Sequence, residues 1–266
     1  MLSYPNIDPV IFGIGPLQVR WYGMMYVLGF AACYFLVRRQ ISSFKLNTLE
    51  REFENLNLTM LICLVVGGRL GYVLFYNFSY YIQHPLEIFA TWQGGMSFHG
   101  GLLGVIVGGW FYCRRKNLNF LENADVYVVT IPIGLGLGRI GNFINGELFG
   151  RVSDVPWAMV FPGGGPFARH PSQLYEALLE GLLLFMILWP LKKAQYKKNW
   201  PYGSMLAVFL ILYGMLRYFV EFFREPDAHI GLMAHAISRG QLLSGIMICA
   251  GLLLLFAVSR KTNNAK

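Results

Sequence analysis

Arg139 is the residue whose position in this chain most needs a chemical explanation. It stands within an otherwise apolar stretch, Val126 to Ile144, in the run GLGLGRIGNFING. A guanidinium at membrane depth costs about 2.5–3.5 kcal/mol on insertion scales, so it needs a partner or a function. The functional interpretation is a planar fork of N–H donors that holds a phosphate. The structural one is an ion pair with a carboxylate such as Glu147 or Glu176. The residue types alone favour neither.

A histidine and a second arginine extend this chemistry. His99 lies in GGMSFHGGLLG, where the glycines leave room for a small reactant or a lipid headgroup beside the imidazole. Histidine is the usual acid or base near neutral pH, although a lone membrane histidine often only bonds one helix to another. Arg224, in VEFFREPD, is a second phosphate contact or the partner of a nearby acid. Arg217 and Glu221 are four residues apart and are expected to neutralise each other, and Arg69 is expected to be structural.

Four polar side chains are predicted to share one depth in the membrane. Counted from the ends of their apolar runs at 1.5 Å per residue, they fall roughly within the outer 8 Å of the hydrocarbon region. They are Tyr22, His99, Arg139 and Arg224. Scattered structural residues have no reason to share a depth, so the agreement predicts a site in the outer leaflet.

The composition indicates that helices in a membrane position these residues. Of the 266 residues, 55% are hydrophobic and only 14% are charged, whereas a soluble domain carries about 25% charged residues. The apolar runs, roughly 17–23 residues each, can cross a bilayer core of about 30 Å. They predict an all-α integral membrane protein with about seven transmembrane helices. The predicted spans are Leu17–Val37, Leu56–Phe78, Gly94–Cys113, Val126–Ile144, Leu174–Leu191, Pro201–Phe223 and Leu242–Val258.

The lysines and arginines between these runs predict the orientation. Alternate connections hold 14 of them in short clusters, and the opposite connections hold only four, Arg151, Arg169, Arg224 and Arg239. The positive-inside rule then puts the N-terminus outside and the C-terminus in the cytoplasm, as seven crossings require. The same clustering argues against a nucleic-acid partner despite the net charge of +8.

The chain is expected to form one transmembrane catalytic domain over residues 1–266. Its turn-rich connection at about 145–173 is expected to form a small external cap. All the cysteines lie in apolar runs without metal-ligand or disulfide spacing, so they are expected to act as small hydrophobes. They are Cys33, Cys63, Cys113 and Cys249. Neither a metal site nor a cofactor is predicted.

Six stretches carry a family resemblance, within a match that runs from about residue 7 to 245. They read DPVIFGIGPLQVRWYGMMY, GGRLGYVLFYN, GGMSFHGG, GLGRIGNFINGELFGR, RHPSQLYE and VEFFREPD. Together they closely resemble the bacterial prolipoprotein diacylglyceryl transferases, and the GRIGNFINGELFGR block is the most specific. The resemblance implies a multi-pass enzyme of the bacterial plasma (inner) membrane. Such an enzyme moves the diacylglyceryl group of phosphatidylglycerol onto the lipobox cysteine of a prolipoprotein signal peptide, forming a thioether and releasing glycerol phosphate.

The resemblance also implies roles for individual residues. The family's catalytic histidine, its two important arginines and the tyrosine of its WYG motif fall on His99, Arg139, Arg224 and Tyr22. The substrate-binding positions fall on the same two arginines and on Asn142, Glu147 and Gly150.

The residue chemistry is consistent with such a reaction. The leaving group is a phosphate ester, and arginines in a low-dielectric site stabilise the charge that develops on it. A neutral His99 is a suitable base for the substrate thiol, and Glu147 is the runner-up. The runner-up enzyme class, the metal-dependent alcohol phosphotransferases, lacks a metal-ligand cluster in this sequence. The alternative from another class is an anion or lipid transporter with an outer-leaflet phosphate site, which the largely apolar inner halves of the spans disfavour.

Overall fold

The structure is a computed structural model that describes residues 2–5, 7–15, 17–225 and 238–263. The chain divides into two compact units, unit 1 (Met1–Gln40 and Ala124–Lys266) and unit 2 (Ile41–Asn123). Helices make up most of both units, which confirms the all-α class, and a two-stranded hairpin is the one sheet in the described part. The single domain over residues 1–266 stays a prediction.

Unit 1 contains the hairpin and most of the helices. The strands β1 (Val10–Ile14) and β2 (Leu17–Arg20) pair antiparallel and lead directly into α1 (Trp21–Phe44). The later elements are α5 (Phe120–Tyr127), α6 (Ile131–Ile144), α7 (Ser172–Glu176), the π-helix η3 (Ala177–Leu183), α8 (Leu184–Lys198), α9 (Ser204–Val220) and α10 (Arg239–Asn263). The first residues of α5 and the last of α1 belong to unit 2.

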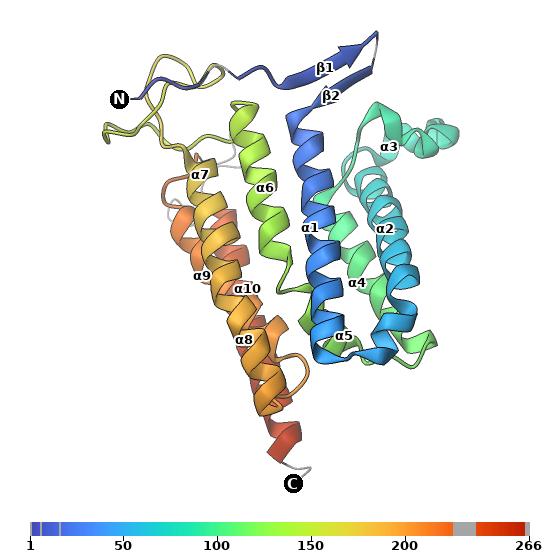
Figure 1. The fold of residues 1–266 in the computed structure, drawn as a ribbon. Helices are drawn as coiled ribbons and strands as arrows, with labels where there is room; N and C mark the ends of the chain where they lie inside the picture. The colour runs from blue at the N-terminus through green and yellow to red at the C-terminus, as the bar shows by residue number, and fades with distance from the viewer. Residues whose placement is uncertain (1, 6, 16, 226–237, 264–266) are drawn as a thin grey trace. The chain divides into compact units, whose positions relative to one another are not determined.

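The helices of unit 1 pack side by side. In Figure 1, α7, η3 and α8 continue into one another as a single long rod, α10 runs along α9, and α6 lies beside α7 and η3. A buried apolar core joins α8 and α9 to the turn before α6. It comprises Val128, Val129, Leu184, Leu188, Met205 and Phe209.

Unit 2 is built on two helices in close contact. These are α2 (Asn47–Phe75) and α4 (Phe98–Arg115), and the connection between them holds α3 (Phe78–Gln83) and two 3-10 turns, η1 (Pro85–Phe89) and η2 (Thr91–Gln93). A Cβ added at Gly71 of α2 would stand 2.7 Å from the Cα atom of Gly100 of α4. Small residues at such a crossing allow the two backbones to approach each other, as in membrane helix pairs.

The number of membrane spans is not settled by helix length. Three helical stretches, Asn47–Phe75, Ser172–Lys198 and Arg239–Arg260, are long and apolar enough to cross a membrane. The pair α5 and α6, bent by 43°, makes a fourth if it is counted as one span. The helix α9 is also apolar, but at 17 residues it is too short to be counted with these stretches. The structure therefore supports a membrane protein, and the count of seven stays a prediction.

Two of the predicted spans begin a few residues before the helices that the structure shows. The first span was predicted from Leu17, but Leu17–Arg20 form β2 and the helix begins at Trp21. The third was predicted from Gly94, but α4 begins at Phe98, because Gly94 and Gly95 adopt positive φ angles of 88° and 76°. Apolar residues and glycines continued the hydropathy pattern past the helix ends in both cases.

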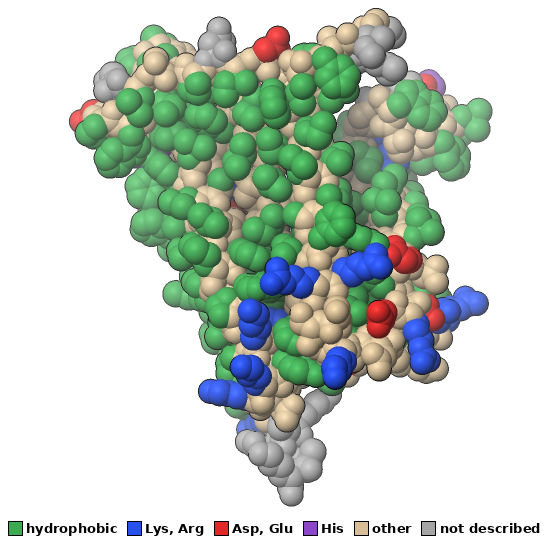
Figure 2. All heavy atoms as spheres, viewed as in Figure 1, with side chains coloured by type: hydrophobic (Ala, Val, Ile, Leu, Met, Phe, Trp, Pro, Cys, Tyr) green, Lys and Arg blue, Asp and Glu red, His purple; other side chains and the backbone are tan. Residues whose placement is uncertain are grey.

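Basic residues gather at one end of the helices in each unit. In unit 1 they lie in the C-terminal parts of α1, α8 and α10, at Arg38 and Arg39, Lys197 and Lys198, and Arg260. In unit 2 they end α4 at Arg114 and Arg115. Figure 2 shows the flanks of the helices covered by hydrophobic side chains, with lysines and arginines gathered near one end. This is the charge distribution from which the orientation was predicted.

Candidate active site

Arg139 of α6 is held by a carboxylate from α7. Its Nε atom forms an ion pair of 2.8 Å with Oε2 of Glu176, whose side chain is fully buried. The predicted pairing of Arg139 with Glu176 is therefore confirmed. It leaves the phosphate interpretation open, because Nε is only one edge of the guanidinium. Within the described chain, neither terminal nitrogen of Arg139 has a hydrogen-bond partner, and the side chain is 21% exposed.

Glu176 binds two further arginines. Arg217 of α9 donates from Nη1 to Oε2 at 2.8 Å, and Arg224 donates from Nη1 to Oε2 at 3.4 Å. Three guanidinium groups from different parts of the chain thus converge on one buried carboxylate. Hydrogen bonds between ionised groups are roughly twice as strong as neutral ones, which allows one carboxylate to organise the cluster.

Arg217 and Arg224 differ in how closely their N–H donors are bound by carboxylates. Arg217 also donates from Nη2 to Glu221 at 2.9 Å, the predicted i, i+4 pair, and lies 3.6 Å from Glu180. Within the described residues, the side chain of Arg224 makes only the long contacts to Glu176 and a 3.9 Å approach to Glu221. Both terminal nitrogens of Arg217 therefore bind carboxylates at short distance, whereas Arg224 retains donors. The three arginines and the three glutamates balance in formal charge.

The π-helix η3 places the carboxylates. It follows Glu176 directly and contains Glu180, and its Gly181 packs closely against Gly136 of α6. A Cβ added at Gly181 would stand 2.7 Å from the Cα atom of Gly136, so a larger residue would push α6 away. Single-turn π-helices occur frequently at functional sites. Here the π-helical turn is the part of the rod that packs against α6, the helix that carries Arg139.

The end of α6 is fixed by its own polar residues. Asn142 donates from Nδ2 to Oε1 of Glu147 at 2.8 Å, and Asn145 donates to the same oxygen at 3.1 Å. Gln173 donates to the backbone oxygen of Glu147 at 2.6 Å. Glu147 thus pairs with amides and not with Arg139, so of the two predicted partners of Arg139 only Glu176 is correct.

Gly150 places the backbone of Arg224. It forms an antiparallel bridge with Arg224, and its N–H donates to the backbone oxygen of His170 at 2.8 Å. A Cβ at Gly150 would collide with the backbone oxygen of Phe223 and would stand 2.9 Å from the Cβ atom of His170. Only glycine allows the two segments to approach this closely, which gives this predicted residue a role in positioning.

The connection at about 145–173 is compact. Arg169 donates to the backbone oxygen of Gly164 at 2.8 Å and of Gly150 at 3.2 Å, and it pairs with Glu225 at 2.9 Å. Backbone bonds also tie Leu2 to Ala158. The predicted cap therefore exists as a folded segment, and its external position stays a prediction.

Hydrogen bonds between aromatic side chains join this cap to α7. Trp157 donates from Nε1 to the hydroxyl oxygen of Tyr175 at 2.6 Å, and that hydroxyl lies 3.0 Å from Nδ1 of His170. Because indole only donates, the hydroxyl hydrogen is available to His170, whose Nδ1 then accepts it. Burial lowers the pKa of His170, which agrees with a neutral ring.

Tyr22 stands in the first turn of α1, against α6. Its ring packs on Gly141, where an added Cβ would lie 3.0 Å from Cδ2 of Tyr22, and its hydroxyl lies 3.0 Å from that of Tyr26. Tyr22 thus contacts the residue that precedes Asn142. The structure brings five predicted residues of unit 1 into one region around α6, α7 and the end of α9. They are Arg139, Arg224, Asn142, Glu147 and Gly150, with Tyr22 packed on the same helix.

His99 belongs to unit 2. It lies in the first turn of α4, two residues after the N-cap residue Ser97, whose Oγ accepts from the N–H of Gly100 at 3.2 Å. The imidazole is exposed and lies edge-on to Phe98, with 5.7 Å between ring centroids. Its proximity to Arg139 stays a prediction.

Sequence reasoning missed the central role of Glu176. It placed Glu176 as a neutraliser of one arginine and set Arg217 aside in a local pair with Glu221. The available signal was four charged residues, Glu176, Glu180, Arg217 and Glu221, on two apolar runs. Which of them meet depends on the rotation of helices about their axes, and the π-helical turn changes that rotation.

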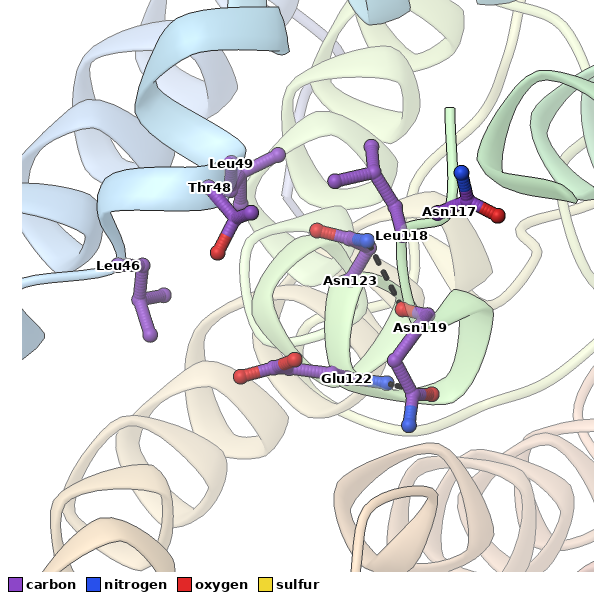
Figure 3. A pocket seen from close by; sticks show the side chains of 8 residues that line it. All are labelled: Leu46, Thr48, Leu49, Asn117, Leu118, Asn119, Glu122 and Asn123. Carbon is purple, nitrogen blue, oxygen red and sulfur yellow. Dashed lines mark hydrogen bonds between the residues drawn. The ribbon is translucent and has the colours of Figure 1, made fainter. Parts of the chain in front are cut away.

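A separate pocket in unit 2 contains none of the predicted site residues. Figure 3 shows it between the start of α2 and the turn that follows α4. It is lined by Leu46, Thr48, Leu49, Asn117, Leu118, Asn119, Glu122 and Asn123. Its polar groups bond locally, for example Oδ1 of Asn119 to the N–H of Glu122 at 3.2 Å, so it is not a candidate for the transfer chemistry.

Comparisons with known proteins match nearly the whole chain. A family model described as prolipoprotein diacylglyceryl transferase matches residues 9–257. Three bacterial proteins named phosphatidylglycerol–prolipoprotein diacylglyceryl transferase are similar to the chain. The one from Desulfotalea psychrophila is 58% identical over 96% of this chain and 94% of its own length. Those from Geobacter sulfurreducens and Pseudoalteromonas atlantica are 53% and 49% identical, over 98% and 99% of this chain and 98% and 94% of their own lengths.

Proposed function

The chain belongs to the prolipoprotein diacylglyceryl transferase family, and we propose that Arg139 and Arg224 bind the phosphate of its lipid substrate. The enzyme is a transferase of lipoprotein biosynthesis, and its relatives' name gives phosphatidylglycerol and a prolipoprotein as substrates. The acceptor is the thiol of the prolipoprotein's lipobox cysteine. The transporter alternative has no support from the family.

The reaction is a displacement at the glyceryl carbon that bears the phosphate. The thiol gives its proton to a base, and its sulfur attacks that carbon. The carbon–oxygen bond breaks, and glycerol phosphate leaves with the bonding electrons as a thioether forms. Negative charge therefore develops on a phosphate oxygen, where preorganised cations in a dry site stabilise the transition state most strongly.

The observation that carries this proposal is the arrangement of Arg139. Glu176 holds the guanidinium at Nε, and the terminal edge has no partner within the described chain. That edge carries the two terminal nitrogens that grip a phosphate in a bidentate contact. Arg224 contacts the same Glu176 carboxylate and retains donors of its own. The two arginines thus offer N–H donors to an anion, and both are bound by the same buried carboxylate.

A direct assay tests the function. The purified protein is incubated with phosphatidylglycerol vesicles and a peptide that carries a lipobox cysteine, and the peptide is analysed by mass spectrometry. We expect one diacylglyceryl group on the cysteine and an equivalent amount of released glycerol phosphate. A matched peptide with serine in place of that cysteine is the control. An unmodified cysteine peptide under conditions where vesicles and protein mix would contradict the proposal.

We further propose that His99 is the base for the incoming thiol. Its exposed imidazole in the first turn of α4 is free to accept a proton, and a substrate thiol with a pKa of about 8.5 is mostly protonated at neutral pH. Within the described residues no cysteine forms a disulfide, and we assign none of the enzyme's cysteines to the reaction.

Substituting His99 by glutamine should lower the transfer rate at pH 7 while lipid binding persists. Raising the pH to 9 should partly restore the rate relative to the unchanged enzyme, because the thiol then ionises without a base. The measurement is the ratio of the two turnover numbers at both pH values. Equal impairment at pH 7 and pH 9 would assign His99 a positioning role and leave Glu147 as the candidate base.

The orientation gives a second prediction. The basic helix ends are proposed to face the cytoplasm, which places Lys198 inside and Pro85 outside. Single cysteines at these positions, in a background without native cysteines, should react oppositely with an impermeant thiol reagent added to intact cells. Labelling at residue 198 and protection at residue 85 would reverse the proposed topology.

A further inference from the structure

Arg69 is a buried arginine whose partners are all backbone oxygens. It lies on α2 and is 4% exposed. Its guanidinium donates to five carbonyl groups at 2.6 to 3.2 Å, and no carboxylate in the described chain pairs with it. The acceptors are the backbone oxygens of Glu87, Ile88, Ala90, Gly94 and Gly95. All three nitrogens are used, so the side chain has no donor left over for a substrate.

These five carbonyls belong to one stretch of chain. It runs from η1 through η2 to the turn at Gly94 and Gly95, and Arg69 also lies over the ring of Tyr81 at 5.1 Å. A Cβ at Gly95 would stand 2.8 Å from Nη1 of Arg69, and φ is +76° there, so the turn needs glycine. The guanidinium therefore fixes the backbone of residues 87–95 against α2.

The same face of α2 fixes the start of α4. Next to Arg69, the backbone oxygen of Gly68 accepts from the N–H of Ser97 at 2.8 Å. Ser97 in turn caps α4 by accepting from Gly100. Arg69 thus binds the backbone of the connection as far as Gly95, and the backbone oxygen of Gly68 binds it at Ser97. His99 follows two residues later.

We propose that Arg69 is a positioning residue for His99 in diacylglyceryl transfer. The proposal rests on the function proposed above for His99. Arg69 sets the direction in which the chain enters α4, and that direction sets the position of the imidazole. A planar group with donors on all three nitrogens can hold five carbonyls at once, whereas a lysine ammonium has three donors. Arg69→Lys therefore keeps the charge and releases part of the stretch.

The test is a double-mutant cycle of Arg69→Lys and His99→Gln. Arg69→Lys alone should lower the turnover number by about ten- to a hundredfold, since small misplacements of a catalytic group have effects of this size. The KM for phosphatidylglycerol should stay about the same. In the His99→Gln background, Arg69→Lys should add little. Full additivity of the two losses would overturn the proposal, because Arg69 would then act through something other than His99.

Two further variants separate positioning from general damage. Arg115→Lys, an exposed arginine at the end of α4, is the matched control and should leave turnover unchanged. Gly95→Ala disturbs the hydrogen bonds between Arg69 and residues 87–95 on the acceptor side, while Arg69 itself is intact. It should therefore reproduce the fall in turnover. A normal rate in folded Gly95→Ala protein would contradict a role for these hydrogen bonds in turnover.

A measurement without activity distinguishes this proposal from the one on which it rests. In histidine-labelled protein, the ring resonance of His99 is assigned by its loss in His99→Gln. Arg69→Lys should shift or broaden that resonance, and Arg115→Lys should not. If His99→Gln retains full turnover, the assigned base is wrong, and the resonance alone then decides whether Arg69 positions His99. An unchanged resonance in Arg69→Lys overturns the positioning role.

Discussion

Arg139→Lys should lower the turnover of diacylglyceryl transfer by about 10–100-fold or more, because hydrogen bonds to charged groups contribute about 1.5–3 kcal/mol each. Lysine keeps the positive charge but replaces the planar fork by a single ammonium group. It cannot hold Glu176 with one edge and a phosphate with the other, as the geometry of Arg139 allows. The measurement is initial turnover with phosphatidylglycerol vesicles and a lipobox peptide.

The matched control for this variant is Arg239→Lys. Arg239 is an exposed arginine of unit 1 at the start of α10, outside the cluster. It should retain normal turnover. A normal rate for the Arg139 variant in folded, membrane-inserted protein would remove the phosphate contact from the proposed mechanism, and Arg224 would then be the first residue to reconsider.

Glu176→Gln should be the most destabilising single change in unit 1. The substitution leaves three guanidinium groups without the buried carboxylate on which they converge. Breaking a buried ion pair by removing one partner costs about 3–5 kcal/mol. We expect a loss of that order in the free energy of unfolding, measured in detergent by denaturant or heat, together with a loss of transfer activity.

Glu225→Gln is the control for the loss of a carboxylate. Glu225 pairs with Arg169 but is 47% exposed, and exposed pairs contribute only about 0–1 kcal/mol. Its variant should unfold close to the unchanged protein. If Glu176→Gln were as mild as this control, the cluster would be stabilised mainly by Glu180 and Glu221, and Glu176 would lose its central role.

Hydropathy predicted the helices well where an apolar run and a helix coincide. It did not predict the ends of the helices: Leu17–Arg20 lie in the first predicted span but form a strand. It also did not predict the bend of 43° between α5 and α6, which falls within the first residues of the predicted span Val126–Ile144. Hydropathy measures how residues partition into lipid, and it does not specify the backbone angles of residues within the run.

The candidate site was predictable residue by residue but not as an arrangement. A charged residue on an apolar run is visible in the sequence, which is why Arg139, Arg224 and their acidic partners were noticed. The convergence of Arg139, Arg217 and Arg224 on one oxygen atom was not visible. It depends on the π-helical turn at Ala177–Leu183 and on the contact between Gly136 and Gly181. Both are products of packing between helices.

The convergence of the arginines on Glu176 also has an entropic consequence. A free arginine side chain carries about 2 kcal/mol of rotamer entropy at room temperature. In this protein much of that freedom is already lost when the chain folds, since Glu176 restrains all three side chains before any lipid arrives. A phosphate that binds Arg139 therefore meets a rigid donor, and little of its binding free energy is consumed in ordering the protein.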